Sequence, residues 1–136
     1  MIQRIQTLWL VLAAMVAVLS IKFPFYTGSL IANNAYLRFT AAENIPILVL
    51  TVISALISAI TIFSFKNRGR QTGLTLLNIF VSIIILVLYF LRLKDFSTGA
   101  FSLTSLFAFA LPVLLILALV GIRKDAKLIK SLDRLR

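Results

Sequence analysis

The chain has 136 residues, of which 61% are hydrophobic and 13% are charged, and its formal net charge is +10. A typical globular domain is about 45–50% apolar and about 25% charged, so this composition predicts a membrane protein. The sequence contains no histidine and no cysteine, which excludes imidazole bases, thiolate nucleophiles, disulfides and the usual zinc, haem and iron–sulfur ligands. We therefore expect no cofactor and no catalytic, cofactor-binding or metal-binding residues.

Charged residues divide the chain into four long uncharged segments. The predicted membrane spans are residues 5–23, 44–65, 71–91 and 101–122, followed by a tail at 123–136. A bilayer core about 30 Å thick needs about 20 helical residues, so each segment is long enough to cross once. Transmembrane β-strands would instead show alternating runs of about ten residues. The predicted fold is an all-α membrane protein, a single domain built as a bundle of four transmembrane helices.

The first segment has two readings. Arg4 followed by an apolar stretch also resembles a secretory signal peptide. The length of the stretch and the poor cleavage site near Ser20 favour a membrane span, with Lys22 reaching from its end to the interface.

Aromatic residues are concentrated between the first two spans, and Asn33-Asn34 predicts a turn among them. Rings that flank a span usually form an interfacial aromatic belt, and a recognition surface is the alternative. The residues are Phe23, Phe25, Tyr26, Tyr36 and Phe39.

The second span has clear start and stop signals. Asn44 is the expected N-cap, with Pro46 in the first turn, where a missing N–H has no cost. Residues 66–70 form a short polar connector, in which Gly69 is suited to a left-handed helix C-cap. The second and third spans should therefore form an antiparallel hairpin.

Hydroxylated residues recur at helical spacing on one face of the second span. They are Thr51, Ser54, Ser58 and Thr61, which we call the α2 stripe. Small residues in this pattern favour close helix packing, and a polar path through the membrane is the alternative.

Polar residues are few in the remaining spans. Asn78 is the most polar side chain within a span, with Ser82 four residues later. We expect Asn78 to hydrogen-bond to a neighbouring helix, although it could also line a pore or bind a lipid headgroup. Pro112 lies midway along the fourth span and removes one backbone hydrogen bond, which predicts either a packing kink or a hinge.

The distribution of basic residues predicts the orientation. Ten of the fourteen Lys and Arg residues lie before the first span, in the 66–70 connector or in the tail, and four lie on the other side. The positive-inside rule therefore predicts that both termini are cytoplasmic, in a bacterial inner membrane.

The tail has the pattern of a basic amphipathic helix. Its cationic stripe is Arg123, Lys127, Lys130 and Arg134, and its opposite face carries Leu128, Ile129, Leu132 and Leu135. Anionic lipid headgroups attract such a stripe with about 1 kcal/mol per basic residue, and a cytosolic partner is the alternative. Nucleic-acid binding is not expected, because aromatic interleaving and known motifs are absent.

Both ends of the chain resemble a known family. Met1–Thr7, Phe23-Pro24, and the ending from Gly121 to Arg136 are similar to small four-helix integral membrane proteins of unknown function from Bacteroidota. This resemblance implies an uncharacterised bacterial inner-membrane protein and supplies no catalytic residues.

No acidic residue lies within the predicted spans, and Lys22 lies at the interfacial end of the first span, which argues against proton- or ion-coupled transport. We expect a non-enzymatic accessory or scaffold subunit, which packs with itself or with another membrane protein through the α2 stripe. The alternative is a small oligomeric channel or a lipid-handling protein.

Overall fold

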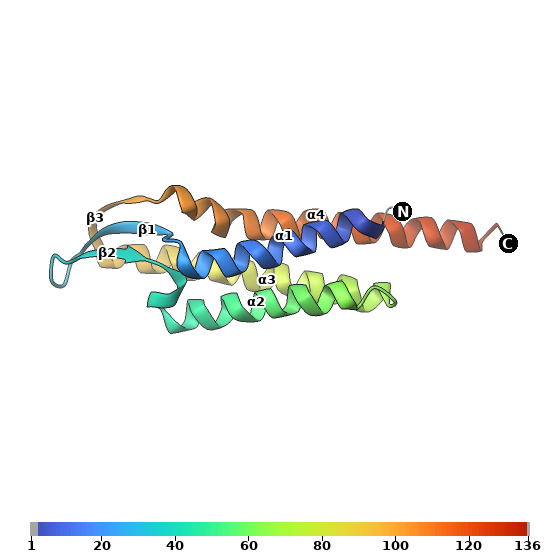
Figure 1. Ribbon diagram of the computed structural model, residues 1–136, viewed down its shortest axis with the longest axis horizontal. Helices are drawn as coiled ribbons and strands as arrows, with labels where there is room; N and C mark the ends of the chain where they lie inside the picture. The colour runs from blue at the N-terminus through green and yellow to red at the C-terminus, as the bar shows by residue number, and fades with distance from the viewer. Residues whose placement is uncertain (1–2, 136) are drawn as a thin grey trace.

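The computed structural model describes residues 3–135 of the chain (Figure 1). Its α-helices are α1 (Gln3–Lys22), α2 (Ile45–Phe63), α3 (Arg68–Arg92) and α4 (Leu106–Asp133). All four are long and apolar enough to cross a membrane, as the sequence predicts. The fourth helix differs most from expectation, because it begins five residues later and continues without a break into the tail.

The four helices pack in a ring in which every neighbour is antiparallel. α1 and α3 each pack against both α2 and α4, as in an up-and-down four-helix bundle. Ala13 and Ala17 of α1 and Ala118 of α4 are fully buried. Such small side chains let helix backbones approach closely. Pro112 lies inside α4, which continues through it.

A three-stranded antiparallel sheet extends the bundle at one end (Figure 1). Its strands are β1 (Tyr26–Leu30), β2 (Tyr36–Phe39) and β3 (Phe96–Phe101), in the order β2-β1-β3. The prediction of an all-α fold was therefore incomplete. The molecule is mostly helical, but the segments before α2 and before α4 pair with each other as strands.

Two glycines make this pairing possible. Gly28 of β1 lies opposite Gly99 of β3, and a Cβ atom on either glycine would collide with the backbone of the opposite strand. The β1–β2 turn contains Asn34 with φ of 52°, a left-handed conformation that asparagine tolerates. The Asn33 side chain accepts a hydrogen bond from the Ala35 backbone N–H at 3.2 Å, so the predicted turn at Asn33-Asn34 is confirmed.

Aromatic side chains attach the sheet to the bundle. Phe25 stacks on Tyr89 of α3, with ring centroids 4.2 Å apart, and Phe39 meets the same tyrosine edge-on at 5.6 Å. Both phenylalanines are buried. The expectation that they belong to an interfacial belt was therefore wrong for Phe25 and Phe39, because the sheet folds them into the core.

The helix ends also differ in part from the prediction. Asn44 precedes α2 and Pro46 lies in its first turn, but the Asn44 side chain makes no capping hydrogen bond. Gly69 does not end α2 in a left-handed conformation. It lies in the first turn of α3, where Asn67 is the N-cap and accepts a hydrogen bond from the Arg70 N–H at 3.1 Å.

Candidate functional site

Asn78 joins α3 to the α2 stripe through three hydrogen bonds. Its amide nitrogen donates to Ser58 Oγ at 2.8 Å and to the Ser54 carbonyl at 3.1 Å, and its oxygen accepts from Ser54 Oγ at 2.6 Å. Asn78, Ser54 and Ser58 are fully buried. Both amide hydrogens of Asn78 are engaged by α2, so this side chain holds two helices of the same chain together.

The rest of the stripe is also buried inside the chain. Thr51 and Thr61 donate to carbonyls one turn earlier in α2, and Ser82 donates to the Ile79 carbonyl. Such bonds satisfy the hydroxyl groups without a partner helix. Because these residues expose almost no surface, the expectation that the α2 stripe contacts a second protein was wrong. Its neighbours belong to the chain itself.

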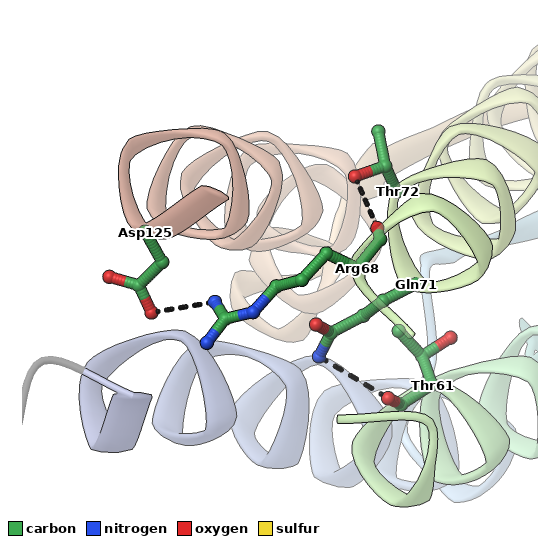
Figure 2. Close-up of polar contacts among 5 residues, drawn as sticks. All are labelled: Thr61, Arg68, Gln71, Thr72 and Asp125. Atoms are coloured by element: carbon green, nitrogen blue, oxygen red, sulfur yellow. Dashed lines mark hydrogen bonds and ion pairs between the residues drawn. The ribbon is translucent and has the colours of Figure 1, made fainter. Parts of the chain in front are cut away.

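A buried ion pair lies at the end of the bundle opposite the sheet. Arg68 Nη1, from the first turn of α3, is 3.1 Å from Asp125 Oδ2 of α4 (Figure 2). Asp125 is 5% exposed and Arg68 is 18% exposed. The pair ties the α2–α3 connector to the place where α4 continues into the tail.

Two buried glutamines, Gln6 and Gln71, lie at the same end of the bundle as this ion pair. Gln71, one turn after Arg68, donates from Nε2 to the Thr61 carbonyl at 3.4 Å (Figure 2). The Oε1 atoms of Gln6 and Gln71 are buried and accept no hydrogen bond from the part of the chain that the structure describes. Gln6 packs directly against Gly121 of α4. A Cβ atom on residue 121 would lie 3.2 Å from Gln6 Cβ, so the absence of a side chain at Gly121 allows this close contact. A polar layer therefore closes this end of the bundle.

The tail residues lie on the exposed continuation of α4, which extends past the other helices (Figure 1). Arg123, Lys127, Lys130 and Arg134 are exposed, and Arg136 lies outside the described residues. Leu128, Ile129, Leu132 and Leu135 are exposed as well, and Leu135 reaches 87%. With Asp125 covered by Arg68, Asp133 is the one exposed acid among the described tail residues.

Sequence reasoning missed the role of Asp125. The local signal was its position three residues after Ile122 and seven after Ala118, on the buried face of α4. Among residues 3–135, no group of three or more acidic side chains is placed to hold a metal ion.

Comparison with known proteins identifies the family. No curated protein and no solved structure matches the chain. A family described as a domain of unknown function, DUF4293, matches residues 2–135, almost the full length. The chain therefore belongs to the DUF4293 family, whose function is unknown.

Proposed function

We propose that this chain is an integral protein of a bacterial inner membrane, of the type found in Bacteroidota, with both termini in the cytoplasm. It acts as a non-enzymatic accessory or scaffold subunit whose basic tail binds anionic lipid headgroups. The observation that carries the proposal is the exposed continuation of α4, where a cationic stripe and an apolar face lie on opposite sides.

The dimensions of α4 fit this role. Its 28 residues give a length of about 42 Å, against about 30 Å for the hydrocarbon core and about 40–45 Å including both headgroup layers. The last part of α4 therefore reaches the headgroup layer when the apolar part spans the core. There the basic side chains can meet lipid phosphates.

The charge distribution supports the same orientation. The α2–α3 connector, with Lys66, and the first turn of α3, with Arg68 and Arg70, lie at the same end of the bundle as the tail (Figure 1). Asp125 pairs with Arg68, so Asp133 is the one acid that stays exposed beside the basic residues among the described tail residues. Because the α2 stripe is buried, we assign contact with any cytosolic partner to the tail.

A single fluorescent label on the full chain tests lipid binding by the tail. The chain has no cysteine, so Leu135→Cys carries an environment-sensitive dye at one defined site. In nanodiscs we expect a blue-shifted emission with phosphatidylglycerol but not with phosphatidylcholine, and the shift should decrease at high salt.

Charge-matched variants make the experiment specific. Lys127→Gln with Lys130→Gln should abolish the lipid-dependent shift, whereas Arg38→Gln with Lys94→Gln, at the sheet end, should leave it unchanged. An emission wavelength that changes with neither lipid charge nor salt concentration would refute lipid binding by the tail. Native mass measurement of the gently extracted protein tests the scaffold role, because a second polypeptide in fixed ratio is expected and a lone monomer would contradict it.

A further inference from the structure

A second candidate site lies at the sheet end, far from the tail. A cavity of about 150 Å³ opens between the sheet and the adjacent helix ends. Its apolar wall comes from all three strands, through Leu30, Leu37, Phe39 and Phe96. Its polar wall comes from the start of α2 and the end of α3.

The polar wall has one guanidinium, that of Arg92, and each of its three nitrogens has a partner in this wall. When the amide oxygen of Asn44 faces Arg92, it accepts hydrogen bonds from Arg92 Nε at 2.7 Å and from Arg92 Nη2 at 3.2 Å. The third nitrogen, Nη1, contacts Asp95 Oδ2 at 3.4 Å. Asn44 is 8% exposed, whereas Arg92 and Asp95 are each 54% exposed, so Asn44 anchors the network on the protein side. This network also explains why Asn44 does not cap α2.

Glu43 is the charged residue of the cavity lining that this network does not pair. Glu43 lines the cavity, and it forms no ion pair with any of residues 3–135. Arg92 balances Asp95, so the cavity carries a net negative charge at Glu43. Phe39 and Phe96, with ring centroids 5.9 Å apart, offer aromatic surface on the opposite side, which also attracts cations.

We propose that this cavity binds a primary ammonium group attached to a short apolar chain. The ammonium pairs with the Glu43 carboxylate, and the apolar part packs on Phe39 and Phe96. Because the cavity lies where α2 begins and α3 ends, two sources can supply the group: a soluble amine or the headgroup of phosphatidylethanolamine. The site is independent of the tail, so either proposal can fail without the other.

Ligand-observed NMR on the full chain in a nonionic detergent tests this proposal. The probe is n-butylammonium, with the neutral n-butanol and the anionic butyrate as matched controls for partition into micelles. We expect saturation transfer from the protein to n-butylammonium only. Glu43→Gln should weaken binding about tenfold or more, while Asp133→Asn, an exposed acid at the other end, should not change it.

Nanodiscs distinguish the two sources. A Glu43-dependent signal that persists in phosphatidylglycerol but disappears in phosphatidylethanolamine assigns the site to the lipid headgroup. A signal that persists in both assigns it to a soluble amine. Equal binding to wild type and Glu43→Gln, or equal signals from n-butanol and n-butylammonium, would overturn the proposal. Glu43 is exposed, so its substitution should leave the helical circular dichroism unchanged.

Discussion

Replacing Asp125 with Asn should destabilise the protein, because it leaves the Arg68 guanidinium partly buried without its counter-charge. The two groups are 3.1 Å apart. At that distance their attraction is about 1 kcal/mol at the dielectric constant of water and about 5 kcal/mol at an effective value of 20. Removing one partner of a fully buried pair costs about 3–5 kcal/mol. Since Arg68 keeps 18% of its surface, we expect a loss of about 2–3 kcal/mol.

Reversible unfolding in mixed micelles, followed by helical circular dichroism, measures this loss. Asp133→Asn is the matched control, because Asp133 lies two turns later on α4 and is exposed. It should change stability by less than about 0.5 kcal/mol. The double substitution Arg68→Met with Asp125→Leu should recover part of the loss, because no unpaired charge then remains buried. Equal effects of the two single Asp substitutions would refute the reasoning.

The other predictions concern the sheet, the α2 stripe and the orientation. Gly28→Ala should lower the melting temperature by disrupting β1–β3 pairing. Gly73→Ala, where a Cβ meets open space, should be neutral or stabilising. Equal shifts in melting temperature for the two variants would contradict the strand register. Ser58→Leu should cost about 1–3 kcal/mol by overpacking the α2–α3 interface, and more than Ile57→Leu in the same unfolding assay. A reporter active only in the periplasm should be silent when fused to either terminus, and activity at one end would refute the proposed orientation.

The helices were predictable because their signal is local. Long uncharged stretches locate all four helices, and the break between α2 and α3, at residues 64–67, overlaps the predicted connector at 66–70. The sequence also predicts that Asn78 hydrogen-bonds to a neighbouring helix. Its partners Ser54 and Ser58 belong to the α2 stripe, which the sequence also identifies as a helix-packing face. Only the structure shows that the stripe is enclosed within one chain.

The sheet and the ion pair were not predictable, because both depend on contacts between distant residues. β1 pairs with a strand about 70 residues later, and β3 contains small residues and no charge that would mark its edge. Asp125 and Arg68 are 57 residues apart. A count of charges assigns every acid near a basic cluster to the solvated surface. The composition of the tail therefore does not predict that Asp125 is buried.

The strand order β2-β1-β3 has a consequence for how the chain is synthesised. β1 and β2 leave the ribosome early as a hairpin, but the third strand follows α3, so the middle strand has an unpaired edge until most of the protein has been made. Closing that edge also fixes the segment before α2 to the segment before α4. When β3 pairs with β1, it joins the two halves of the protein. Until then, the free edge of β1 can pair with other extended chains, so the stage after α3 has formed carries the greatest risk of mispairing.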